Sequence, residues 1–137
     1  MTITCRRPAL AALLLGLMVL AGCNTEGPAY NLPSPIYSQV IDMTSLLSFS
    51  PEQVTIKAGE TVLWRNKTLL SHTVTADPQK VDDPADVSLP PGAEPFASGD
   101  IEPGEVFAFK FKTPGTYHYV CRTHEGMNMH GTIVVTE

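Results

Sequence analysis

The residue types best able to do chemistry in this 137-residue chain gather in one short segment near its C-terminus. Residues 121–130 read CRTHEGMNMH and hold one cysteine, two histidines and two methionines. Thiolate, imidazole and thioether groups are ligands that favour transition metals. Because His124 follows Cys121 by three residues and the methionines stand at 127 and 129, one loop can wrap a single ion. We therefore predict a metal site in this segment.

One more ligand must come from a distant part of the chain, and the candidate is His72, which follows the segment NKTLLS. A thiolate, two imidazoles and a weak thioether make a trigonal site with a long axial bond. That ligand set suits copper that shuttles between Cu(II) and Cu(I). Zinc would accept the thiolate and the imidazoles but has little use for a methionine. The residues thus predict copper and leave Met127 and Met129 both open as the thioether.

The first 22 residues predict a secretory signal rather than part of the folded domain. Arg6 and Arg7 give a positive start, and the apolar stretch of 12 residues from Ala9 to Leu20 is too short to span a membrane comfortably. The tetrapeptide LAGC that ends at Cys23 resembles the lipobox of bacterial lipoproteins. This resemblance implies a diacylglycerol on the Cys23 thiol, a cut just before it, and a tether to a membrane surface. The alternative is a plain signal peptide with a chance cysteine.

Cysteine and charge counts constrain the mature chain further. Cys5 leaves with the signal and Cys23 is used for lipid, so Cys121 is the only thiol of the folded domain. In an oxidising compartment a lone thiol is a liability unless something occupies it, and a metal is the natural occupant. Seven basic and 14 acidic residues remain after residue 22, a formal charge of about −7. This charge argues against nucleic acid as a partner and favours a basic docking partner.

Two proline-rich segments interrupt the pattern of a folded core. Residues 23–36 hold three prolines and read as an extended linker after the lipid, so the domain is expected at 37–137. Residues 77–95 hold five prolines and five acidic residues, and they predict a long solvated loop or insertion. This insertion is either variable decoration or an acidic docking surface.

Short β-strands must position the ligands. Residues 53–66 alternate apolar and polar types on both sides of a turn, and 106–111 alternate phenylalanine with other types. Residues 117–121 place Cys121 on the same face as two tyrosines, while 72–76 and 131–137 read as further strands. No amphipathic helix is evident after the signal. Seven or eight such strands predict an all-β sandwich with Greek-key connections.

The whole pattern resembles the plastocyanin-like cupredoxins, also called type 1 or blue copper proteins. The resemblance covers residues 40–137 and rests on VTIKAGETVLWRN, SHTV, SGDIEPGEVFAFKFKTPGTYHYVC and the C-x-x-H-x-x-M-x-M loop, in this order. It implies a cupredoxin-like sandwich of about eight strands, a single copper ion at one end, and one-electron transfer. Carried over by position, it implies His72, Cys121 and His124 as equatorial ligands.

The resemblance offers two axial ligands. Some members have a C-x-x-H-x-x-M loop, which selects Met127. Others place the methionine five residues after the histidine, followed by x-Gly and the final strand, which selects Met129. Gly131 opens the last strand two residues after Met129 and matches the longer loop. We therefore predict Met129, with Met127 as the alternative and otherwise a soft apolar residue at the loop rim.

Several neighbours of these ligands carry expectations of their own. His118 is expected at the surface or in a structural role, and His130 at an exposed loop end, with an accessory copper role as the alternative. Thr73 stands where many members have asparagine, and its backbone amide is expected to donate to the Cys121 sulfur. Such hydrogen bonds tune reduction potentials. Leu69 and Leu70 belong either to the core or to the apolar rim that surrounds the exposed copper histidine in this family.

The resemblance implies a membrane-tethered carrier of single electrons between a redox donor and acceptor, for example a cytochrome or a copper enzyme. Val120 and Arg122 depart from the commonest pattern and put a plant-type photosynthetic partner in doubt. No acid–base pair or nucleophile is evident apart from the copper ligands, so we expect no enzyme and no small-molecule substrate. The expected location is the cell envelope, on the periplasmic or extracytoplasmic face of a bacterial membrane. The alternative function is copper storage or delivery, which Met127 and His130 would support as extra soft ligands.

Overall fold

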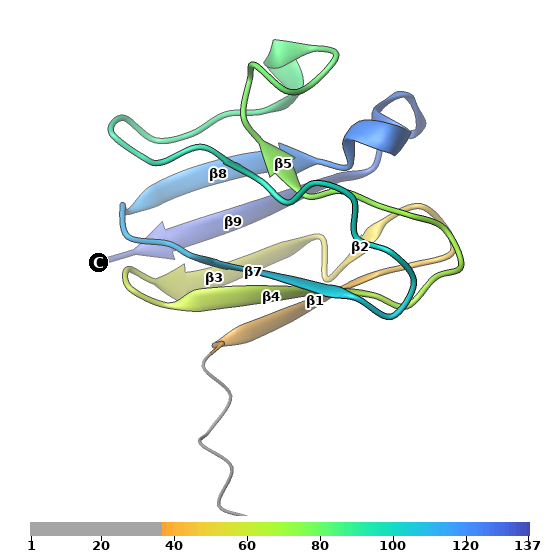
Figure 1. Ribbon diagram of the computed structural model, residues 1–137. Helices are drawn as coiled ribbons and strands as arrows, with labels where there is room; N and C mark the ends of the chain where they lie inside the picture. Colours follow the sequence, from red (N-terminus) through yellow and green to blue (C-terminus); the bar gives the residue numbers. More distant parts are fainter. Residues whose placement is uncertain (1–36) are drawn as a thin grey trace, which may run out of the picture. The chain divides into compact units, whose positions relative to one another are not determined.

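The computed structural model describes residues 37–137, which fold as two β-sheets enclosing one core (Figure 1). This confirms the predicted all-β sandwich. The predicted signal at 1–22, the lipidation site Cys23 and the linker 23–36 lie outside the described residues. Within 37–137, the helical segments are too short to cross a membrane.

The described residues form nine strands, three of which are only two residues long, against about eight expected. The first sheet has the order β2-β1-β4-β7, with β2 at Phe49–Ser50, β1 at Gln39–Met43, β4 at Thr61–Asn66 and β7 at Val106–Lys110. The second has the order β3-β9-β8-β5-β6, with β3 at Gln53–Lys57, β9 at His130–Thr136, β8 at Gly115–Val120, β5 at Thr75–Ala76 and β6 at Phe96–Ala97.

The strands β3 and β4 show the predicted alternation but do not form a hairpin. Val54 and Ile56 of β3 and Val62 and Trp64 of β4 are buried between partly or fully exposed neighbours. Yet β3 pairs in parallel with β9, whereas β4 pairs in parallel with β1 and antiparallel with β7. The turn around Gly59, at φ 92°, therefore carries the chain from one sheet to the other. Such changes of sheet recur along the chain, as in Greek-key sandwiches.

Aromatic side chains fill the core between the two sheets. The Trp64 ring meets that of Tyr119 edge-on, with centroids 5.4 Å apart, and also packs against Phe107 and Phe111. Burial raises the pKa of the Tyr119 phenol, so this side chain stays neutral at any physiological pH. Its ring lies against Gly131 of β9, where an added Cβ would overlap the ring. Gly131 is therefore required by the close approach of β8 to β9.

The strand predicted at 72–76 is much shorter in the structure. Only Thr75 and Ala76 form β5, and His72 makes a single bridge to Ile101. All five residues of this segment are nonetheless buried. Side chains from distant segments take two of the backbone N–H groups here: that of Thr73 donates to Sγ of Cys121, and that of Val74 donates to Oγ of Ser98.

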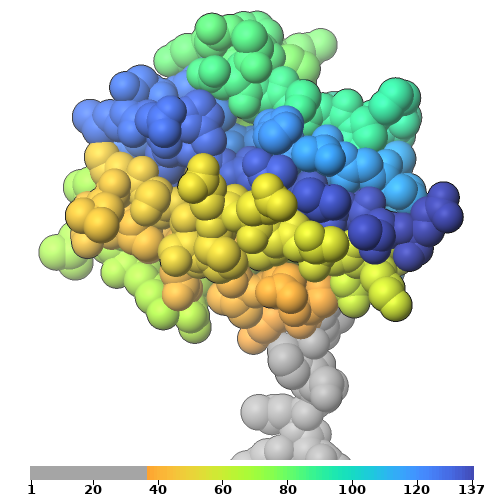
Figure 2. Space-filling model, turned by 180° about the vertical axis from the view of Figure 1, so that it is seen from behind, coloured from red at the N-terminus to blue at the C-terminus, as the bar shows by residue number. Residues whose placement is uncertain are grey.

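The insertion at 77–95 is exposed along much of its first half but not along its whole length. It contains a short 3-10 helix, η1 (Pro84–Asp86), after which Val87 is buried and Leu89 packs against the core. Ser88 bridges His118 of β8. In the space-filling view the green surface of this insertion lies directly above the blue surface of the segment that follows β8 (Figure 2). The prediction of a long solvated loop is therefore wrong for Val87 and Leu89, whereas Ser88 is exposed.

Candidate metal centre

The structure brings together His72, Cys121 and His124, which come from two distant parts of the chain. Their ligand atoms all lie within 4.8 Å of one another. The Cys121 Sγ is 3.7 Å from Nδ1 of His72 and 3.3 Å from Nδ1 of His124. Cys121 and His72 are fully buried, whereas His124 is partly exposed. One thiolate and two imidazole nitrogens converging on one point form a donor set suited to copper.

The loop between β8 and β9 presents Cys121 and His124 on one short segment. Cys121 directly follows β8, and its N–H donates to the carbonyl of Met129 at 3.0 Å, which closes the loop. The next six residues form a second 3-10 segment, η2 (Arg122–Met127), in which the N–H of His124 donates to the carbonyl of Cys121. Asn128 adopts a left-handed conformation, at φ 63°, that turns the chain back toward β9. The hydrogen-bonded ends fix the distance between thiol and imidazole.

The two methionines of this loop occupy opposite environments. Met129 is 0% exposed and belongs to the same buried cluster as Cys121. Met127 is 63% exposed. A thioether buried in the same cluster as the thiol is suited to reach an ion there, while one in solvent is not. Burial thus favours the predicted Met129, although its role as a ligand stays a prediction.

The two remaining histidines lie away from this cluster. His118 is exposed on β8 and its Nδ1 lies 3.1 Å from the hydroxyl of Thr132, so it occupies the surface position expected of it. His130 is the first residue of β9, is half-buried, and pairs with Val120. It is therefore less exposed than the loop-end position predicted.

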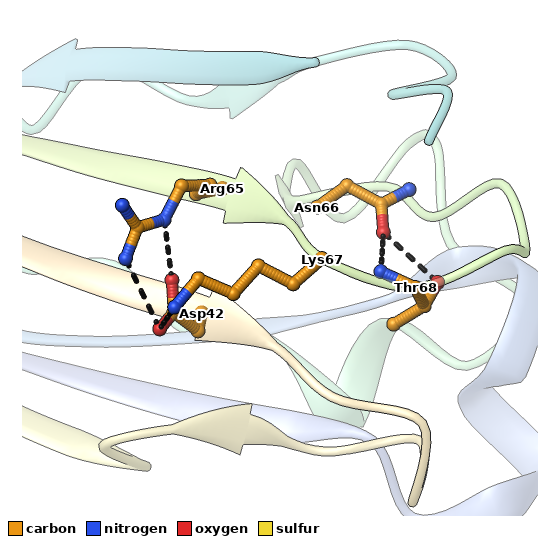
Figure 3. A network of polar contacts seen from close by, with 5 residues as sticks. All are labelled: Asp42, Arg65, Asn66, Lys67 and Thr68. Atoms are coloured by element: carbon orange, nitrogen blue, oxygen red, sulfur yellow. Dashed lines mark hydrogen bonds and ion pairs between the residues drawn. The ribbon is translucent and has the colours of Figure 1, made fainter. Parts of the chain in front are cut away.

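A buried polar network holds the His72 ring, and the sequence analysis missed it. Nε2 of His72 lies 3.0 Å from the hydroxyl oxygen of Thr68. The same oxygen lies 2.9 Å from Oδ1 of Asn66 (Figure 3). The N–H of Leu70 also donates to this hydroxyl, and the side-chain amide of Asn66 donates to the carbonyls of Leu70 and Ile101. The only available signal was Asn-x-Thr at a strand end, a pattern typical of side-chain-capped turns.

This network favours one tautomer of His72. The Asn66 and Leu70 carbonyls both lie within reach of the single hydroxyl proton of Thr68, which favours the tautomer whose Nε2–H donates to the hydroxyl oxygen. Nδ1 is then left without a proton and faces the Cys121 sulfur. Burial, and then the charge of His124, lower the pKa of His72, which keeps the ring neutral. A neutral ring with a free Nδ1 is the form that binds a metal.

The outer surface of β4 is tied to β1 just before this network. Nε of Arg65 lies 2.8 Å from one Asp42 oxygen, and Nζ of Lys67 lies 2.7 Å from the other (Figure 3). The hydrogen bond from Arg65 lowers the pKa of Asp42. Figure 3 shows Asn66 extending away from this group toward Thr68. These exposed pairs add little stability one by one, but they hold the strand end from which the His72 loop begins.

Hydrogen-bond donors surround the Cys121 sulfur. The predicted donor, the N–H of Thr73, lies 3.3 Å from Sγ, which confirms that expectation. The hydroxyls of Thr73 and Thr123 lie 3.9 and 3.7 Å away. The Thr73 hydroxyl accepts from the N–H of Arg122 at 2.7 Å, so its own proton is free to point to the sulfur. Such donors stabilise negative charge on sulfur and tune the potential of a bound metal.

Glu125 joins the metal-site loop to the insertion, and sequence reasoning missed it. Its side chain is buried, and its carboxylate accepts from the N–H groups of Asp82 and Asp83 at 3.1 and 2.8 Å. An acidic residue in an acidic protein gave no sign that it would point inward. The insertion is thereby hydrogen-bonded to the segment that carries His124.

Residues 37–136 match the family model described as "Copper binding proteins, plastocyanin/azurin family". The chain belongs to the plastocyanin/azurin family of copper-binding proteins. The plastocyanin of Scenedesmus fuscus is 43% identical over 91 residues, which span 65% of this chain and 87% of the relative. The chloroplastic plastocyanin of Tetradesmus obliquus is 38% identical over 65% of this chain, but the match spans only 59% of that longer relative.

Solved structures agree with this assignment. Amicyanin from Paracoccus versutus superposes with a TM-score of 0.56 at 25% identity, over 77% of this chain and 86% of amicyanin. A copper-containing nitrite reductase from Thermus scotoductus gives 0.57 at 28% identity, over 72% of this chain but only 22% of the enzyme. The likeness to the enzyme is therefore partial. This family member is a cupredoxin whose cofactor is a single type 1 copper ion, and it is an electron-transfer protein rather than an enzyme.

Proposed function

We propose that the protein carries single electrons between redox proteins while tethered to a membrane, and that His72, Cys121, His124 and Met129 would hold the copper ion. The observation that carries the ligand assignment is the convergence of the thiol and two imidazoles within 4.8 Å at one end of the sandwich. Copper bound there supplies the Cu(II)/Cu(I) couple.

The protein's own residues would hold this site nearly unchanged between the two oxidation states. Three features support rigidity. The hydroxyl of Thr68 orients the His72 ring, the N–H of Thr73 holds the sulfur, and the bond from Cys121 to Met129 closes the loop. Because these groups are buried, water has little access to the sulfur, and little reorganisation would accompany electron transfer.

The partly exposed His124 would be the electron's exit. Large apolar side chains are exposed on the two segments that carry the histidines: Leu69 is 93% exposed, Leu70 51% and Met127 63%. The expectation that Leu69 and Leu70 could belong to the core is therefore wrong. Exposed apolar side chains of this kind mark interaction surfaces. We place the docking face for a redox partner, such as a cytochrome or a copper enzyme, at this end of the domain.

The predicted signal and lipobox support a location at the extracytoplasmic face of a bacterial membrane, periplasmic where an outer membrane is present. Residues 24–36 would link Cys23 to the domain. Thirteen extended residues reach at most about 45 Å, since each residue spans roughly 3.3–3.6 Å. The copper site would therefore stay within reach of membrane-bound redox complexes.

The test is the visible spectrum of copper-loaded protein. We expect an intense thiolate-to-Cu(II) band, a reversible one-electron couple, and loss of the band in Cys121→Ser. A colourless protein that holds only Cu(I) and passes it to an acceptor would instead establish copper delivery. The exposed thioether of Met127 is the feature that favours this second function.

A further inference from the structure

A cavity of about 150 Å³ is lined by residues that directly follow the candidate ligands His72 and Cys121 in the chain. Two of its wall residues, Thr73 and Arg122, contact or directly follow Cys121. Roughly 10–15 Å³ on the same measure holds one water molecule, so the cavity accommodates a small polyatomic ion. The complete lining consists of Thr73, Thr75, Lys80, Ala97, Gly99 and Arg122.

The wall of this cavity carries positive charge in a domain of the opposite sign. Residues 37–137 hold seven basic and 13 acidic residues. The fourteenth acidic residue of the chain, Glu26, precedes this range. Two of the seven, Lys80 and Arg122, line the cavity. Lys80 lies 3.6 Å from Asp77, whereas Arg122 forms no ion pair with any residue in the described range. A concave site walled by two cations concentrates small anions.

Buried hydroxyl-bearing residues complete the cavity. Thr73 and Thr75 are 2% and 3% exposed and line it together with the two cations. Guanidinium and ammonium groups bind oxyanions strongly, and the Thr75 hydroxyl can add a further donor, whereas the Thr73 hydroxyl already faces the Cys121 sulfur. A second cavity, of about 320 Å³, is lined by Gly126 and four acidic residues and would repel the same ions. Both cavities are lined in part by residues of η2, Arg122 in the basic cavity and Glu125 and Gly126 in the acidic one. Because the acidic cavity repels anions, an oxyanion should bind in the basic one.

We propose that this cavity binds a small oxyanion such as inorganic phosphate, and that the bound anion lowers the reduction potential of the copper centre. Thr73 lines the cavity and donates its N–H to the Cys121 sulfur. A single residue therefore lies between the bound anion and the sulfur that would hold copper. A nearby negative charge stabilises Cu(II) more than Cu(I). By linkage, the oxidised protein binds the anion more tightly than the reduced protein. The effect on potential rests on the proposed electron-transfer function, whereas anion binding does not.

The test is a titration of copper-loaded protein with inorganic phosphate at constant ionic strength, with chloride as the balancing anion. Amide NMR of the reduced, diamagnetic form reports binding, and we expect saturable shifts at Thr73, Thr75 and Gly99. Electrode potentials report the coupling. A tenfold preference for the oxidised form corresponds to a fall of about 59 mV at saturation.

Two charge-matched variants locate the site. Arg122→Gln keeps the backbone N–H that bonds Thr73 but removes the guanidinium. We expect about tenfold weaker phosphate binding, the cost of one charge-assisted hydrogen bond, and a reduced response of the potential. Lys110→Gln removes one positive charge from an exposed position on β7 outside the cavity and should bind phosphate as the parent does.

Three results would overturn the proposal in distinguishable ways. Absence of saturable shifts, or equal shifts with chloride, would refute the site. If phosphate binding is weakened equally in Arg122→Gln and Lys110→Gln, the binding depends on the net charge of the protein and not on this cavity. Saturable binding with an unchanged potential would refute the coupling to copper. A protein without the visible band that still binds phosphate would overturn the proposed electron transfer and leave the anion site standing.

Discussion

At the scale of single residues, Thr68 does more for the metal centre than its position suggests. Its one hydroxyl oxygen receives the Nε2 proton of His72 and the N–H of Leu70, and its proton goes to Asn66 or to the Leu70 carbonyl. The hydroxyl therefore favours the tautomer in which Nδ1 of this buried imidazole is free. Groups that orient metal ligands commonly affect metal affinity 10–100-fold.

We expect Thr68→Val to weaken copper binding by about 10–100-fold and to lower the free energy of unfolding by about 1–3 kcal/mol, because the buried Nε2–H loses its acceptor. Competition with a copper chelator and urea unfolding measure the two quantities. Thr68→Ser keeps the hydroxyl and should restore both. If the serine and valine variants behave alike, the hydroxyl is irrelevant and only the shape of the side chain matters.

The axial ligand is a second question at the scale of residues. Met129→Leu should keep the visible colour and shift the reduction potential, because the weak axial bond tunes the couple without holding the ion. Met127→Leu should leave the potential unchanged, because that side chain lies largely in solvent. Cyclic voltammetry of both variants decides between them, and the opposite pattern would assign the axial position to Met127.

At the scale of elements, patterns of period two located the regular strands. The alternation of apolar and polar residues in β3 and β4, and of phenylalanines with other residues in β7, is visible from neighbouring residues alone. The pairing of β3 with β9 instead of β4 is set by packing across the whole chain, which alternation does not encode. In the same way, the Cys-x-x-His spacing revealed one side of the metal site, but the Asn66–Thr68 network depends on how the loop folds back.

The insertion at 77–95 should depend on Glu125 of η2. In Glu125→Ala the N–H groups of Asp82 and Asp83 lose a charged acceptor, and we expect their hydrogen exchange to accelerate by about tenfold or more. Glu94→Ala is the matched control, because it removes an exposed carboxylate of the same insertion that only approaches Lys112 at 3.9 Å. Unchanged exchange in Glu125→Ala would mean that other contacts hold the insertion.

At the scale of the whole molecule, the entry of the chain and the metal centre lie at opposite ends of the sandwich. The first residue of β1, Gln39, pairs with Val62 near the start of β4, whereas the His72 loop begins at the other end of β4, after Asn66. Figure 1 shows the same separation between the start of β1 and the loop after β8. An anchor before residue 37 would leave the proposed docking face free.

The proposed anchor predicts the location of a variant. Cys23→Ala should move the protein from the membrane fraction to the soluble fraction, because the acyl chains supply the membrane affinity. Cell fractionation followed by immunoblotting measures this, and the soluble variant should keep its blue colour because the copper site is distant. Retention on membranes after high-salt washing would rule out lipid as the anchor.

The place of β9 in its sheet has a consequence for biosynthesis. This strand, residues 130–136, lies between β3 and β8, so the second sheet has a gap at its centre until Thr136 has left the ribosome. Cys121 and His124 stand before this strand, in a loop that only its docking closes. We therefore expect neither the complete second sheet nor the closed loop around Cys121 and His124 to form before β9 has been synthesised.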